Sequence, residues 1–162
     1  MEEPHSVTFG RLASPASANR QPYLKITFFL IKKSGLSDQE FHSHWETVHA
    51  DLTVAAKGFR EIQALRYVQF HQTPEIRAAA EGLGYPVLPY DGCTEIYVKR
   101  LEDWKTFSSS PAFSRALGGD AAKFLESNVF IMAGYENIIF GKAIDGLGGT
   151  DGLLPEDLKA LA

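Results

Sequence analysis

The sequence predicts an α+β fold, because segments with strand-like and helix-like periodicity follow one another in a recognisable order. Strand, helix, strand, strand, helices and strand is the order of a ferredoxin-like four-stranded antiparallel sheet with helices on one face. A length of 162 residues with 44% hydrophobic content suits one globular domain. Because aromatic residues occur on both sides of the predicted strands, the other face of the sheet also needs cover, and we expect a symmetric homodimer to provide it.

The predicted domain spans residues 23–141. It follows a flexible leader of residues 1–22 and precedes a Gly-rich tail of residues 142–162, in which a weak helix is predicted over 155–161. The first strand, residues 23–33, is dense in aromatic and β-branched side chains. A helix then begins after Ser37 and runs to about residue 58. Ser37 and Glu40 form a capping box at its start, and Leu36 and Phe41 are placed as a hydrophobic staple.

This helix carries three of the five histidines in the chain. A rotation of about 100° per residue defines the stripe that faces the core. That stripe holds Phe41, Trp45, Val48, Leu52, Ala55, Ala56 and Phe59. His49 lies on the shoulder beside Trp45, His42 is peripheral, and His44 is expected to face away.

The later elements place further polar groups on defined faces. The strand over 62–71 directs Tyr67, Gln69 and His71 to one side, and the strand over 92–100 does the same for Cys93, Glu95 and Tyr97. Between them, residues 73–91 form a loop with one helical turn at 75–81, which we expect to act as a lid or binding loop. A short helix over 101–109 comes next. A second helix starts at Ser110-Pro111, with Asp120 capping a final turn, and residues 129–140 form the last strand.

Composition excludes several classes of partner. The net charge is −4 and no run of basic residues is present, so nucleic acid is not an expected partner. No apolar stretch approaches the roughly 20 residues that span a bilayer, and residues 1–21 lack the apolar centre of a signal peptide. We therefore expect a cytoplasmic protein without membrane contact. The single cysteine, Cys93, excludes an internal disulfide and is expected to be a small core residue.

Several separated segments together resemble the EthD domain of dimeric α+β barrel proteins. The matching residues are Gly35 to Phe41, Trp45, His49-Ala50, Arg66 to Gln69, Tyr90 to Gly92, Glu95, and Ala133 to Glu136. The resemblance covers about residues 23–141. Within that superfamily the sequence is most similar to small fungal proteins of the atrochrysone carboxylic acid decarboxylase type. This implies a homodimeric, cofactor-free decarboxylase of an aromatic polyketide acid of the anthrone or anthraquinone type, with its pocket between sheet and helices.

Decarboxylation requires an ionised carboxylate, a polarised neighbouring oxygen and a proton for the remaining carbon. With the resemblance included, His49 is the predicted acid–base residue and His71 its partner, because imidazole titrates near neutral pH. His49 could instead be a structural histidine that is hydrogen-bonded to a loop carbonyl. His71 could instead be a histidine at the end of its strand that faces solvent. Glu95 is either a third catalytic group with a raised pKa or a structural ion-pair partner. The predicted substrate-binding residues are Trp45, Tyr67, Gln69, Asp91 and Tyr97. Trp45 could instead be a core residue, and Tyr67 and Gln69 could instead be a buried polar pair with satisfied hydrogen bonds.

Other functions remain open on the same fold. The reaction could be a cyclisation, a dehydration or an anthrone oxidation, or the protein could be a non-catalytic binding or stress-response dimer. His42, Glu46 and His49 share one helical side, but the metalloprotease signature H-E-x-x-H is missing and the resemblance brings no metal. We therefore expect neither a metal nor a cofactor.

Overall fold

The computed structural model describes residues 7–13 and 19–161. The chain forms two compact units, one of Leu24–Gly134 and one that combines Met1–Tyr23 with Tyr135–Ala162. Four strands form one sheet in the order β2-β3-β1-β4: β1 is Arg20–Leu30, β2 is Arg66–His71, β3 is Gly92–Val98 and β4 is Phe130–Asn137. Strand β3 pairs antiparallel with both β1 and β2. The predicted ferredoxin-like α+β architecture is confirmed.

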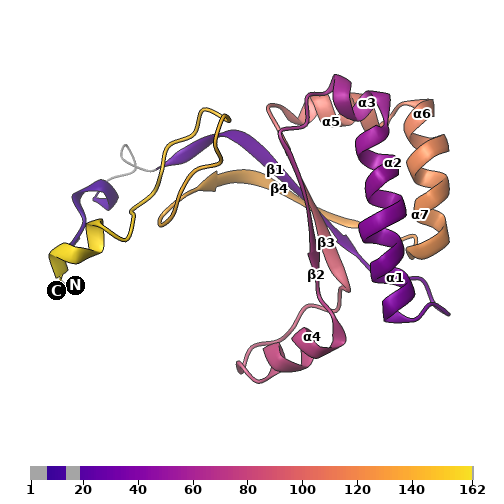
Figure 1. The fold of residues 1–162 in the computed structure, drawn as a ribbon, viewed down its shortest axis with the longest axis horizontal. Helices are drawn as coiled ribbons and strands as arrows, with labels where there is room; N and C mark the ends of the chain where they lie inside the picture. The colour runs from indigo at the N-terminus through magenta and orange to yellow at the C-terminus, as the bar shows by residue number, and fades with distance from the viewer. Residues whose placement is uncertain (1–6, 14–18, 162) are drawn as a thin grey trace, which may run out of the picture. The chain divides into compact units, whose positions relative to one another are not determined.

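Helices gather on one face of the sheet in the larger unit (Figure 1). The first group consists of α1 (Asp38–His44), a π-helical turn (Trp45–His49), α2 (Ala50–Ala55) and α3 (Lys57–Glu61). The second consists of α5 (Leu101–Ser108), α6 (Pro111–Phe113), another π-helical turn (Ser114–Gly118) and α7 (Gly119–Phe124). Helix α4 (Pro74–Glu81) lies in the β2–β3 connection. In the described ranges, no helix combines the length and apolarity needed to cross a membrane.

The start of α1 agrees with the prediction. The Ser37 hydroxyl accepts from the Glu40 backbone N–H at 3.2 Å, and the Glu40 carboxylate accepts from the Ser37 N–H at 2.8 Å. One turn later Phe41 and Trp45 are fully buried in a cluster with Leu30 and Phe124, against which Leu36 packs. The capping box and the apolar stripe therefore fix where this helix starts and which side faces the sheet.

The π-helical turn corrects the predicted wheel beyond Trp45. Val48, expected on the buried stripe, is 46% exposed, whereas Thr53 is buried. A π turn closes i→i+5 hydrogen bonds and so holds one more residue than an α turn, which rotates the following side chains by about 100°. His49, which was expected on the shoulder of the helix, consequently lies on its inner side together with Thr53. The helix also ends earlier than predicted, since Ala56 leaves the helical conformation with ψ of 128°.

The smaller unit joins segments predicted as leader and tail. Strand β1 begins at Arg20, three residues before the predicted start, and Gly10–Leu12 forms a 3₁₀ turn. The Gln21 amide donates to the Thr150 carbonyl at 3.0 Å, and Arg11 donates to the Asp151 carbonyl at 2.7 Å. The predicted helix near the C-terminus is a 3₁₀ turn over Asp157–Leu161. The remainder of the predicted flexible leader, residues 1–6 and 14–18, lies outside the described residues.

Candidate active site

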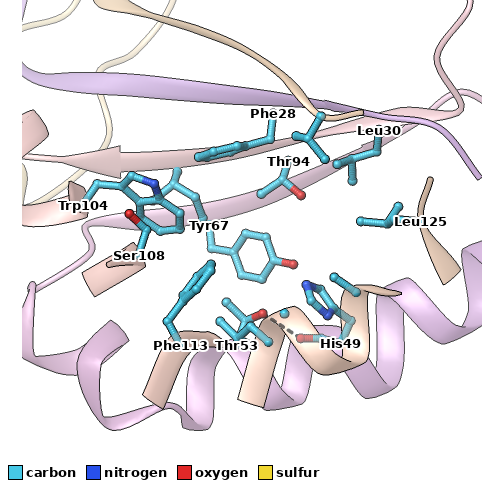
Figure 2. Close-up of a pocket in the computed structure, with 15 residues that line it drawn as sticks. Phe28, Leu30, His49, Thr53, Tyr67, Thr94, Trp104, Ser108, Phe113 and Leu125 are labelled. Atoms are coloured by element: carbon cyan, nitrogen blue, oxygen red, sulfur yellow. Dashed lines mark hydrogen bonds between the residues drawn. The ribbon is translucent and has the colours of Figure 1, made fainter. Parts of the chain in front are cut away.

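A cavity of about 410 Å³ lies between the sheet and the helices of the larger unit (Figure 2). Most of its wall is apolar, with Phe28, Trp104 and Phe113 gathered toward one end. The lining residues with polar side-chain groups are His49, Thr53, Tyr67, Thr94, Ser108 and, through its indole N–H, Trp104. Such a cavity suits a flat, largely apolar molecule with a few oxygen substituents.

His49 is held by a carboxylate from the facing helix. Its Nδ1 lies 3.0 Å from Oδ2 of Asp120, whose side chain is only 3% exposed. A carboxylate can only accept here, so Nδ1–H is the donor and Nε2 is the nitrogen left for chemistry. The Thr53 hydroxyl donates to the His49 carbonyl at 2.7 Å on the same helix (Figure 2). His49 and Asp120 therefore form an oriented dyad at the cavity wall.

The two members of the dyad titrate away from their ordinary values. Burial lowers the pKa of His49, and the hydrogen bond and charge of Asp120 offset only part of that effect. For Asp120, burial opposes ionisation, but hydrogen bonds from His49 and His44 outweigh it and lower the pKa of this carboxyl. The resting dyad at neutral pH is thus a neutral imidazole beside an ionised carboxylate.

His44 does not face away from the site, contrary to the prediction from the helical wheel. Its Nε2 lies 3.1 Å from both carboxylate oxygens of Asp120. The Lys123 ammonium is 3.4 Å from Oδ1 of the same carboxylate. Asp120 is therefore the centre of a small polar cluster and not the helix cap that we predicted, since α7 begins at Gly119 with Gly118 as its N-cap.

Asp120 is a candidate functional residue that the predicted site does not include, although the sequence contains a pattern that points to it. Leu117, Asp120, Ala121 and Phe124 recur at i, i+3, i+4 and i+7, which places the carboxylate on an otherwise apolar helical face. A buried carboxylate needs a partner, and two histidines on the facing helix supply it. His49 ends the π turn Trp45–His49, and Asp120 follows the π turn Ser114–Gly118 by two residues.

Tyr67, Gln69 and His71 lie on the helix-facing side of β2, as predicted, but only Tyr67 lines the cavity. The Gln69 amide donates to the Tyr67 hydroxyl at 2.7 Å, and His71 Nε2 lies 3.2 Å from Gln69 Oε1. Trp45 is fully buried and does not line the cavity, with its ring centroid 4.4 Å from that of His71. His42, predicted to be peripheral, does not line the cavity, and its Nδ1 lies 2.7 Å from Nδ1 of His71.

The remaining predicted site residues lie apart from the cavity. Glu95 is on the opposite face of β3 from Thr94 and Ile96 and forms an ion pair of 3.1 Å with Lys25. Tyr97 shares that face, is buried, and contacts the Arg66 guanidinium at 5.7 Å from its ring centroid. Asp91 accepts from the Lys32 N–H at 2.7 Å and pairs with Arg77 at 3.1 Å. Within the described ranges, no three His, Cys, Asp or Glu side chains are arranged to hold a metal ion.

Comparison with known proteins identifies relatives over most of the chain. It is 26% identical over 145 residues to the decarboxylase claH of Passalora fulva, covering 84% of this chain and 93% of that protein. It is 24% identical over 151 residues to the decarboxylase nsrE of Aspergillus novofumigatus, covering 87% and 97%. An EthD family protein of Bacillus halodurans is similar in structure, with a TM-score of 0.48, 19% identity, and coverage of 70% and 98%. The sequence profile of the EthD domain matches residues 33–128. The chain therefore belongs to the EthD domain family, as its sequence motifs predicted.

Proposed function

We propose that the protein is a homodimeric decarboxylase of an aromatic polyketide carboxylic acid of the anthrone or anthraquinone type, acting without a cofactor. The observation that carries the proposal is the His49–Asp120 dyad on the wall of an aromatic-lined cavity. The two relatives named decarboxylases, which align over most of this chain, support the reaction type.

The dyad can supply the proton that the reaction consumes. A substrate carboxylate beside Nε2 of His49 favours the imidazolium form, which Asp120 stabilises through Nδ1–H. The bond between the ring carbon and the carboxylate then breaks, CO2 leaves, and the electron pair moves onto the neighbouring carbonyl oxygen. Imidazolium Nε2–H protonates the carbon, and His49 takes a proton from water afterwards. The Tyr67 hydroxyl, which is directed toward the His49 end of the cavity (Figure 2), is a polar group available to the carbonyl oxygen.

The apolar wall contributes to the same step. Phe28, Trp104 and Phe113 offer faces and edges against which fused aromatic rings can pack. Loss of CO2 moves the negative charge from the carboxylate onto a larger conjugated system. An apolar site destabilises this delocalised charge less than it destabilises the localised charge of the carboxylate. The cavity therefore favours the charge distribution that follows bond cleavage over the one that precedes it.

Mass spectrometry of aromatic polyketide acids incubated with the protein tests the proposal. We expect a product lighter by the mass of CO2, formed equally with and without a chelator. His49→Ala is expected to lower kcat by about 10²- to 10⁴-fold, whereas Val48→Ala, at the exposed neighbouring position, should leave it unchanged. Loss of water, gain of oxygen, or binding without turnover would instead support a cyclase or dehydratase, an oxygenase, or a binding protein.

A further inference from the structure

A row of polar side chains leads from the edge of the helical layer to the cavity. His42 Nδ1 lies 2.7 Å from His71 Nδ1, and His71 Nε2 lies 3.2 Å from Gln69 Oε1. The Gln69 amide nitrogen lies 2.7 Å from the Tyr67 hydroxyl, which reaches the cavity. The four side chains therefore form one continuous chain of hydrogen bonds, separate from the His49–Asp120 dyad.

The Trp45 backbone carbonyl fixes the direction of this chain. Gln69 Nε2 lies 2.8 Å from that carbonyl oxygen, and because a carbonyl only accepts, the Gln69 amide nitrogen must face it. The two amide hydrogens are then used by the Trp45 carbonyl and the Tyr67 hydroxyl. Gln69 Oε1 is left to accept, so His71 Nε2 carries a hydrogen.

The protonation of His71 fixes the direction of the hydrogen bond between His42 and His71. Burial, together with the neighbouring His42, lowers the pKa of His71, so this imidazole is neutral near pH 7. A neutral imidazole that donates from Nε2 accepts at Nδ1, and therefore His42 donates from its own Nδ1. Every hydrogen in the chain consequently points toward the cavity.

Tyr67 is the end of the chain and the only member that can touch a bound molecule. Its oxygen accepts from Gln69, and the Thr53 and Thr94 side chains also interact with this hydroxyl. Because the Gln69 hydrogen occupies one lone pair of the oxygen, the hydroxyl hydrogen can be donated within the cavity that Tyr67, Thr53 and Thr94 line. Burial raises the pKa of Tyr67, so the hydroxyl stays protonated at neutral pH. Figure 2 shows this hydroxyl directed toward the end of the cavity where His49 lies. Hydrogen bonds that run in one direction polarise one another and strengthen the last donor.

We propose that Tyr67 is a catalytic residue that donates a hydrogen bond to the substrate oxygen on which negative charge develops, and that Gln69, His71 and His42 are positioning residues that fix its direction. The catalytic part of this inference rests on the proposed decarboxylation, since that reaction places charge on an oxygen. The direction of the chain does not depend on the substrate.

Histidine NMR on the unmodified protein tests the direction alone. In ¹⁵N–¹H correlation spectra near pH 7, we expect His71 to be protonated at Nε2 and unprotonated at Nδ1, and His42 to be protonated at Nδ1. A His71 protonated only at Nδ1 would overturn the inference, whatever reaction the protein catalyses.

Two substitutions test the catalytic role. Gln69→Glu replaces the amide by a carboxylate, which only accepts hydrogen bonds. The Tyr67 hydroxyl would then donate its hydrogen to this carboxylate and could no longer donate it to the substrate. We expect this variant and Tyr67→Phe each to lower kcat by about 10²-fold, with little change in KM, and the double variant to be no worse than either. Gln63→Glu makes the same chemical change at an exposed position and should behave like the unmodified protein. Full activity in Gln69→Glu, or additive losses in the double variant, would overturn the inference.

A probe without a carboxyl group separates this inference from the proposed function. The carbonyl stretching frequency of bound anthraquinone, measured by Raman difference spectroscopy, should be lowered by the Tyr67 hydrogen bond. We expect Tyr67→Phe and Gln69→Glu to raise that frequency equally, and Gln63→Glu to leave it unchanged. If anthraquinone does not bind while the predicted tautomers are found, the substrate class of the proposed function fails and the directed chain stands. Binding with no change in frequency in either variant would overturn the role of Tyr67 as donor.

Discussion

In the proposed mechanism Asp120 acts on the reaction only through His49, so its replacement should have a distinctive effect on the kinetics. In Asp120→Asn the imidazole keeps a neutral partner at Nδ1 but loses the charge that stabilises its protonated form. We expect kcat to fall by about 10- to 100-fold, less than in His49→Ala, because the proton donor itself remains. Steady-state kinetics measure this, with Asp51→Asn on the exposed side of α2 as the matched control. An Asp120→Asn variant with unchanged kcat would remove the dyad from the mechanism.

In the proposed mechanism, the pH dependence of kcat/KM reports the protonation of His49 in the free enzyme. The donor is the imidazolium, so activity falls as pH rises through the pKa of His49. Burial lowers that pKa. The alkaline limb of the profile, where kcat/KM falls as pH rises, should therefore lie below the ordinary histidine pKa of about 6.5. Asp120 raises the pKa of His49, and Asp120→Asn should therefore move the limb to still lower pH. A limb that moves upward, or stays in place, would contradict the assignment.

The helix that carries His49 shows where prediction from sequence succeeds and where it stops. Its start follows from Ser37 and Glu40, because a capping box is a local interaction between residues close in sequence. The inward turn of His49 does not follow, because a fixed rotation per residue cannot anticipate the π turn at Trp45–His49. The His49–Asp120 contact joins residues 71 positions apart, and only tertiary packing brings them together.

The strands show the same division. Alternation correctly placed Tyr67, Gln69 and His71 on one face and Glu95 on the face opposite Thr94. It could not say how deep the cavity reaches along β2, and so Gln69 and His71 were predicted to project into it. Helix packing ends the cavity at Tyr67, and the residues beyond it support that side chain instead of lining the wall.

Gly92 is a position where strand and helix are too close for any side chain. A Cβ there would lie 2.5 Å from the Phe70 carbonyl oxygen and 2.7 Å from the Trp45 ring. Because the nearer atom belongs to the backbone, we expect Gly92→Ala to lower the free energy of unfolding by about 1–3 kcal/mol, a fall in Tm of several degrees. Thermal denaturation followed by circular dichroism measures this. Gly134→Ala, where a Cβ meets nothing within 4 Å, is the control, and equal melting temperatures for the two variants would contradict the tight contact.

The edge strand β4 has an exposed apolar surface that is a candidate for the interface of the proposed homodimer. Phe130, Ile131 and Met132 follow one another in this strand and are 57%, 65% and 62% exposed. Since consecutive side chains alternate across a strand, apolar groups are exposed on both of its faces. Such a strand at the edge of a sheet also has unpaired backbone groups and tends to associate unless it is covered. Val129, directly before β4, lines the cavity, so a partner on β4 would lie close to the proposed site.

We therefore expect a mass of about twice 17.9 kDa in solution, measured by light scattering after size exclusion. A stable dimer buries about 1,200–2,000 Å² in total, and a charge in the middle of such a surface leaves an unpaired ion at the contact. Ile131→Glu should accordingly shift the protein to monomers at micromolar concentration. Ile76→Glu introduces the same charge at a similarly exposed position on α4, 58% against 65%, and should leave the dimer intact. A monomeric unmodified protein would rule out the proposed assembly, whereas an Ile131→Glu variant that remains dimeric would place the contact away from β4.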